Sequence, residues 1–142
     1  MADVLLVYWS GTGNTEIMAE KIKEGLENAG ISVDYRTVDQ VSPSEVIDFE
    51  KIIFGCPSMG VEILEEDEFE PFFEEVEPSL VGKKVAIFGS YGWGEGEWMD
   101  SWQDRVVASG AVLFKEGLKI NSTPSGDEED TCVAFGEEFA KF

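Results

Sequence analysis

The chain has 142 residues, 43% of them hydrophobic, which is long and apolar enough to bury a core, and we expect a single domain over residues 1–142. Thirty acidic residues against ten basic ones give a formal charge of −20 at pH 7, which disfavours nucleic acid and anionic membranes as partners. The absence of histidine excludes histidine-based acid–base catalysis and removes the commonest transition-metal ligand. A partner protein with a basic surface is the natural expectation, although acidity can also serve solubility alone.

The sequence shows no signal for a membrane or for secretion. No run of about 18 apolar residues could span a bilayer, and the first residues lack the basic start and the small-residue cleavage site of a signal peptide. Cys56 and Cys132 are far apart and form no C-x-x-C motif, so we expect two reduced thiols that pack in the core. We therefore predict a cytoplasmic protein without a bound metal.

The predicted elements alternate between strands and helices. An apolar run at Val4–Val7 predicts a buried strand, and the spacing of apolar residues from Glu16 to Asn28 predicts the first helix. Apolar and polar residues alternate over Ile31–Arg36, which favours a strand at the edge of a sheet. The later elements are strands at 51–55, 83–89 and 111–118, a helical turn at 42–45, helices at 69–76 and 97–109, and a last helix that carries Cys132, Phe135 and Phe139.

This alternation is typical of an α/β fold in which helices cover both faces of a parallel sheet. In such folds ligands bind beyond the carboxyl ends of the strands, at the point where the strand order reverses. Three unusual loops, at residues 10–15, 57–62 and 90–97, each follow a predicted strand. We expect these loops to converge on one site.

The first of these loops has the composition of a phosphate site. Gly11 and Gly13 allow a ligand to approach the backbone closely, and the start of the following helix favours an anion. Hydroxyl and amide donors are supplied by Ser10, Thr12, Asn14 and Thr15. The loop has no Lys or Arg and completes neither G-x-x-x-x-G-K-[ST] nor G-x-G-x-x-G, so a phosphate monoester held by neutral donors fits best. The alternative is an ordinary turn with a helix cap.

The other two loops carry large, flat or polarisable side chains beside glycines. Met59 lies in the second loop, and Tyr91 and Trp93 lie in the third. An aromatic ring system attached to the phosphate could stack between the Trp93 and Met59 side chains. Glycines at 92, 94 and 96 would let backbone N–H groups point at ring heteroatoms. The alternative is that Met59 and Trp93 are ordinary core residues.

Three segments together resemble the flavodoxin family, specifically the short-chain flavodoxins of anaerobic bacteria. They are Tyr8–Thr15, Cys56–Gly60 with Glu62, and Gly89–Gly94, and the likeness covers nearly the whole chain. The resemblance implies a flavodoxin-like three-layer sandwich with a five-stranded parallel sheet in the order 2-1-3-4-5, which binds FMN noncovalently. The cofactor-binding residues that it implies are Ser10, Gly11, Thr12, Gly13, Asn14, Thr15, Ser58, Met59, Gly60, Val61, Glu62, Ser90, Tyr91, Gly92, Trp93 and Gly94.

The resemblance also implies a role for each part of this site. The loop over residues 10–15 would hold the FMN phosphate, with Ser90 nearby. Trp93 would stack on one face of the flavin and Met59 on the other. Glu62 would accept a hydrogen bond from the flavin N3–H.

The backbone of Gly60 and Val61 would meet flavin N5. In the family this peptide turns over on one-electron reduction, so that its carbonyl accepts the new N5–H and stabilises the neutral semiquinone. A β-turn over 59–62 suits a positive φ at Gly60, whereas a β-branched residue such as Val61 resists one. We therefore expect Val61 to bias the turn towards the form that it has when the flavin is reduced.

The implied protein is a low-potential, one-electron carrier rather than an enzyme, cycling mainly between semiquinone and hydroquinone. Its partners would be redox enzymes with basic docking surfaces, and we expect a monomer. Acidic residues from Glu62 to Glu70 would help to lower the second potential. The alternatives are a flavin-dependent reductase that binds a nicotinamide or a quinone, a regulatory flavoprotein with one dedicated partner, and a domain of this fold that has lost its ligand.

Overall fold

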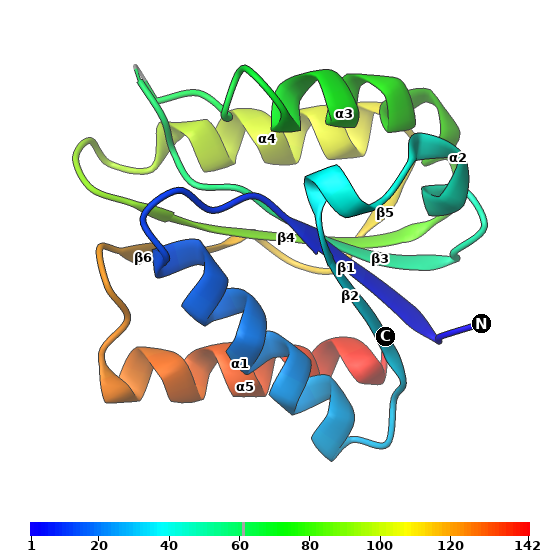
Figure 1. The fold of residues 1–142 in the computed structure, drawn as a ribbon, viewed down its shortest axis with the longest axis horizontal. Coiled ribbons are helices and arrows are strands. Elements are labelled where there is room, and N and C mark those ends of the chain that lie inside the picture. The colour runs from blue at the N-terminus through cyan, green and yellow to red at the C-terminus, as the bar shows by residue number, and fades with distance from the viewer. Residues whose placement is uncertain (61) are drawn as a thin grey trace.

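The computed structural model describes residues 1–60 and 62–142, and it has a sheet between two layers of helices (Figure 1). The strands are β1 (Val4–Tyr8), β2 (Val33–Thr37), β3 (Lys51–Gly55), β4 (Lys84–Tyr91), β5 (Val112–Leu113) and β6 (Leu118–Asn121). The helices are α1 (Asn14–Asn28), α2 (Pro43–Val46), α3 (Phe69–Val76), α4 (Glu97–Ala108) and α5 (Gly126–Ala140), with short 3₁₀ turns at Val38–Gln40 and Glu77–Ser79. Over these ranges no helix combines the length and the apolar character needed to cross a membrane.

The strands pair in the predicted order, β2-β1-β3-β4-β5, and all the strand pairs are parallel. Every residue of β1 is buried, as its apolar sequence predicts, while every residue of β2 is half-buried at the edge of the sheet. Tyr8 pairs with Thr37 and with Gly55, and Gly55 pairs with Phe88. The carboxyl ends of the central strands therefore lie together at one edge of the sheet.

Helices α1 and α5 cover one face of the sheet, and α2, α3 and α4 cover the other (Figure 1). Successive residues of β1 point to opposite faces, so Leu5 and Val7 enter the core under α3 and α4 while Val4 and Leu6 enter the core under α1 and α5. The α/β sandwich predicted from the alternation of elements is confirmed.

Helices α1 and α5 pack with their backbones in close contact. A Cβ atom at Gly136 would meet the carbonyl of Ile22, and one at Gly25 would meet the carbonyl of Val133. Only glycine allows this approach, and it holds α1 firmly against α5. The start of α1 is thereby fixed at the carboxyl edge of the sheet, next to the loop after β1.

Several element boundaries differ from the sequence prediction, and those of α1 and β4 bear on the carboxyl edge of the sheet. α1 begins at Asn14 instead of Glu16, because Gly13 takes a φ of 99° and starts the helix directly after the loop. β4 continues through Ser90 and Tyr91, which the high glycine content had placed in an irregular loop. Pairing with β6 extends the strand there, and this partner could not be identified from local composition.

The last strand, predicted as one element over 111–118, is split into β5 and β6, both of which pair with β4. Between them the ring of Phe114 packs edge-on against Phe135 of α5, with ring centroids 5.4 Å apart. The Gly117 N–H donates to the Gln103 side chain of α4. These contacts with both helix layers draw the chain out of the sheet for a few residues.

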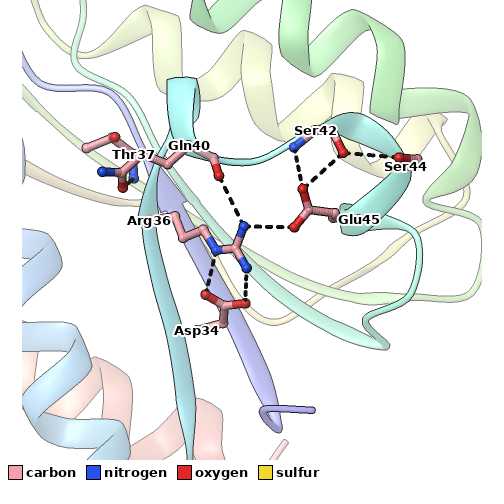
Figure 2. Close-up of polar contacts among 7 residues, drawn as sticks. All are labelled: Asp34, Arg36, Thr37, Gln40, Ser42, Ser44 and Glu45. Atoms are coloured by element: carbon pink, nitrogen blue, oxygen red, sulfur yellow. Dashed lines mark hydrogen bonds and ion pairs between the residues drawn. The ribbon is translucent and has the colours of Figure 1, made fainter.

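A polar network joins β2 to α2 at the β2 edge of the sheet (Figure 2). Arg36 donates to both carboxylate oxygens of Asp34, at 2.8 and 3.0 Å, to Glu45 at 2.7 Å and to the Gln40 carbonyl at 3.1 Å. The Ser42 N–H donates to Glu45 at 3.2 Å and caps α2, which confirms the predicted helical turn. The hydrogen bond from the Ser42 N–H and the ion pair with Arg36 hold the pKa of Glu45 below its usual value.

Candidate functional site

A cavity of about 190 Å³ lies where the loops after β1, β3 and β4 meet. All three loops that the sequence analysis singled out contribute to its walls, together with a fourth loop after β6. The lining residues are Trp9, Gly11, Thr12, Asn14, Pro57, Ser58, Met59, Ser90, Tyr91, Gly92 and Ser122. The predicted convergence of the three loops is therefore confirmed.

The loop after β1 is held in shape by Ser10. Its hydroxyl oxygen accepts hydrogen bonds from the Gly13 N–H at 3.2 Å and from the Glu16 N–H at 3.3 Å. Gly11 and Thr12, which lie between Ser10 and Gly13 in the chain, line the cavity. Ser10 thus supports the loop from behind, while its neighbours and the start of α1 present donors to an anion.

Thr15 and Ser90 form a buried hydroxyl pair behind the cavity wall. Thr15 is 1% exposed, its hydroxyl lies 2.8 Å from the Ser90 hydroxyl, and it accepts the Ser90 N–H at 3.3 Å. If the Thr15 O–H donates to Ser90, the Ser90 hydroxyl proton is free to donate to a ligand, and Ser90 does line the cavity. Thr15 therefore orients Ser90.

The loop after β3 is a tight hairpin, defined here as residues 59–63. Met59 and Ile63 exchange two backbone hydrogen bonds, with N–O distances of 2.8 and 3.1 Å. Gly60 has the positive φ that the sequence predicted, 52°, and Glu62 has one of 53°, which the sequence analysis missed. The bias predicted for Val61 falls on the one residue outside the described ranges. The hairpin is one residue longer than the expected β-turn, because Ile63 and not Glu62 closes it.

Glu62 reaches from the hairpin to the start of α4. One carboxylate oxygen accepts the Trp98 N–H at 3.0 Å, where the helix N-terminus favours an anion. The other, Oε1, is buried and has no hydrogen-bond partner among the described residues. It lies against Gly94, where a Cβ atom would collide with it. A buried acceptor without a donor is costly, so this oxygen suits a ligand with a ring N–H, such as the FMN N3–H.

The two side chains expected to cover the ring faces are on the surface. Met59 is 38% exposed and Trp93 is 65% exposed, so the alternative that both are core residues is wrong. Met59 lines the cavity, whereas Trp93 stands outside its walls as the described residues form them. Tyr91 lines the cavity and packs against Trp98, with ring centroids 5.5 Å apart.

The sequence analysis missed the loop after β6. Ser122 lines the cavity with a φ of 58°, and its N–H donates to the Tyr91 carbonyl at 2.7 Å. The Thr123 hydroxyl donates to the Asn14 side chain at 2.9 Å, which ties this loop to the start of α1. The loop follows the carboxyl end of a strand, as the other three do, and this rule could have identified it.

Neither cysteine is placed for chemistry. Cys56 and Cys132 are buried free thiols, which agrees with the predicted packing role. Burial raises the pKa of the Cys56 thiol well above its ordinary value and that of Cys132 to about 12, so both stay protonated at neutral pH. In residues 1–60 and 62–142, no group of three or more His, Cys, Asp or Glu side chains is arranged to hold a metal ion.

Known proteins match this chain over nearly its whole length. A family model described as Flavodoxin matches residues 6–136. The flavodoxin of Clostridium beijerinckii is 46% identical over 135 residues, covering 95% of this chain and 97% of the relative, and that of Megasphaera elsdenii is 44% identical over 138 residues, covering 97% and 98%. The solution structure of two-electron reduced Megasphaera elsdenii flavodoxin aligns with a TM-score of 0.89, covering 98% of this chain and 99% of that one. From these matches and from the cavity between its loops, the chain belongs to the flavodoxin family of FMN-binding electron-transfer proteins.

Proposed function

We propose that this protein is a low-potential one-electron carrier between redox enzymes, and that its noncovalently bound FMN cycles mainly between semiquinone and hydroquinone. The observation that carries the proposal is the cavity at the carboxyl edge of the sheet, which joins a neutral, donor-rich loop to a hairpin with an acidic border. The family supplies the class of reaction, and the acidic border favours a low potential.

The FMN phosphate would bind in the loop over residues 10–15. The part of this loop that lines the cavity carries no charged side chain, so the backbone N–H groups and the dipole of α1 are what attract the anion. Ser58 in the loop after β3 and Ser90 in β4 add hydroxyl donors. Ser10 and Thr15 contribute indirectly, because their hydroxyls hold the loop and orient Ser90.

The flavin ring would lie between Met59 and Trp93. Bound FMN supplies the redox chemistry, since it can accept and release single electrons. Glu62 Oε1, which lacks a partner within the described part of the chain, would accept the N3–H. Gly60 in the hairpin would face flavin N5. The absence of a side chain at Gly94 leaves room for the Glu62 carboxylate in this position.

Negative charge beside the ring would make addition of the second electron harder. Each carboxylate at about 10 Å costs roughly 0.4 kcal/mol against an anionic flavin at the dielectric constant of water, and five amount to on the order of 100 mV before salt screening. Glu70 does not add to this sum, because both of its oxygens bind Arg105, at 2.7 and 2.8 Å. The carboxylates that remain are Glu62, Glu65, Glu66, Asp67 and Glu68.

The surface around the hairpin and Trp93, where the flavin ring would lie, would bind partner proteins. Met59, Ile63 and Trp93 are 38%, 40% and 65% exposed, and the acidic residues at 66–68 are exposed beside the hairpin. A small apolar patch with an acidic border fits a redox enzyme with a basic docking surface. We also propose that the protein works as a monomer in the cytoplasm, where two buried free thiols fit a reducing compartment.

An anaerobic reductive titration of the FMN-loaded protein, followed by visible absorption, tests the carrier function. Two separate one-electron steps through a blue neutral semiquinone would support it. Bleaching in a single step, or oxidation of NAD(P)H by the protein alone, would instead indicate a two-electron reductase. An apoprotein that does not respond to added FMN would refute the site.

A further inference from the structure

The segment that leads from the hairpin to α3, residues 64–69, is organised around the buried side chain of Glu65. Glu65 is only 6% exposed. Its Oε1 accepts the N–H groups of Glu68 and Phe69, each at 2.8 Å, and its Oε2 accepts the Asp67 N–H at 2.9 Å. One carboxylate therefore satisfies three backbone donors at the start of α3, where N–H groups have no partner within the helix.

The backbone of Glu65 is fixed as firmly as its side chain. Its N–H donates to the Cys56 sulfur at 3.4 Å, directly after β3. Its carbonyl accepts the Glu70 N–H at 2.8 Å, inside α3. Glu65 thus joins the end of a central strand to the helix that covers it.

Only one residue separates this anchor from the hairpin. Ile63 closes the hairpin against Met59, and the next residue, Leu64, is 6% exposed and packs in the core under α3 and α4. A movement of Glu65 would be transmitted to Ile63 through a single buried residue. The second leg of the hairpin therefore leads directly into the segment that the Glu65 carboxylate holds in place.

We propose that Glu65 is a positioning residue for the redox site, which acts by holding the hairpin against the flavin ring. This inference rests on the proposed function, because the effect on the flavin passes through the hairpin. A negative charge alone would lower the second potential, at which the flavin becomes anionic. It would leave the first potential nearly unchanged, because a proton accompanies the electron when the neutral semiquinone forms. Correct placement of the hairpin instead raises the first potential, because it stabilises the product of that step.

Glu65→Asp separates placement from charge. The variant keeps the carboxylate but is one methylene group shorter, so it cannot reach all three N–H groups. We expect amide hydrogen exchange at Asp67, Glu68 and Phe69 to become about tenfold faster in the apoprotein. In the FMN-loaded protein we expect the midpoint potential of the first one-electron step to fall.

Glu66→Gln is the matched control. Glu66 is exposed and has no hydrogen bond among the described residues, so the variant removes one charge next to Glu65 without altering the anchor. It should leave the exchange of the three amides and the first midpoint potential unchanged. If the three amides of Glu65→Asp exchanged as slowly as those of the wild type, or if its first potential were unchanged or raised, the proposal would be overturned.

If Glu65→Asp does not fold, Glu65→Gln replaces it. This variant keeps the side-chain length but places an amide donor against one of the three N–H groups. The positioning role predicts a lower first potential, whereas loss of charge alone leaves the first potential unchanged and raises the second. Amide exchange is measured without FMN, so an unaltered exchange rate contradicts the anchor, whereas a wild-type protein that does not bind FMN contradicts the proposed function.

Discussion

The phosphate end of the cavity, at residues 10–15 and Ser90, differs from the ring end, at residues 59–63 and Gly94. The difference lies in how far the protein satisfies its own polar groups. At the phosphate end, Ser10 accepts two backbone N–H groups, and the Thr15 and Ser90 hydroxyls bond to each other. At the ring end, Glu62 keeps one buried oxygen without a partner within the described ranges, and both Gly60 and Glu62 have positive φ. The phosphate end is preorganised, whereas the ring end has a buried acceptor that a ligand N–H would satisfy.

The two ends also differ in charge. The cavity-lining part of the phosphate loop carries no charged side chain, while the ring end borders a run of carboxylates, of which Glu65 is buried and Glu66 is exposed. Affinity for FMN should therefore depend mainly on the first end, and its redox potentials mainly on the second. The following changes test whether the phosphate end and the ring end contribute in these separate ways.

Removal of the phosphate from the ligand should have the largest effect. Riboflavin leaves the donors of the 10–15 loop without an anion, which forfeits two or three charge-assisted hydrogen bonds. At about 1.5–3 kcal/mol each, these bonds lead us to expect riboflavin to bind at least about a hundredfold more weakly than FMN. Quenching of flavin fluorescence on titration of the apoprotein measures both affinities. Similar affinities would show that the ring end dominates binding.

Thr15→Val tests the preorganisation of the phosphate end. The change keeps the shape of the side chain but leaves the buried Ser90 N–H without its acceptor. We expect the free energy of unfolding of the apoprotein to fall by about 1–3 kcal/mol in urea denaturation. Thr12→Val is the control, since Thr12 faces the cavity, and it should weaken FMN binding with little loss of stability. Equal stabilities of the two variants would contradict the buried pair.

Gly94→Ala tests the ring end. The added Cβ would collide with the Glu62 carboxylate, and the φ of 83° is unfavourable for alanine, so we expect a loss of about 1–2 kcal/mol in the stability of the apoprotein. Gly92→Ala is the matched control, because a Cβ there meets no atom within 4 Å. The urea midpoint of Gly92→Ala should stay close to that of the wild type. A stable Gly94→Ala protein would show that Glu62 moves freely.

Trp9→Phe should have the smallest effect, because it removes one exposed hydrogen bond between the two ends of the cavity. The indole N–H of Trp9, next to the phosphate loop, donates to Glu68, in the acidic segment at residues 65–68, at 3.3 Å. Because this contact is exposed, Trp9→Phe should weaken FMN binding by only about 0.5–1 kcal/mol. Glu68→Ala and the double variant complete a double-mutant cycle. Strictly additive losses would show that the two ends bind FMN independently.

Much of the site could be predicted because its signals are local. The apolar run of β1, the small polar residues at 10–15 and the glycines of the third loop each report their own structure. A parallel fold then requires the loops after the strands to meet, and they do. The misplaced start of α1 and the unexpected length of β4 are failures at element ends, where the neighbouring chain segment decides how far an element extends.

The sequence by itself determined the order of the elements, the phosphate-type loop and the acidic surface, because each depends on residues within one turn or one strand. Only the tertiary structure decided which distant groups meet. Thr15 and Ser90 are 75 residues apart, Trp98 and Glu62 are 36 apart, and Thr123 and Asn14 are 109 apart. These contacts follow from the sheet order and from the packing of α1 on α5, and no local pattern of residues specifies either of them.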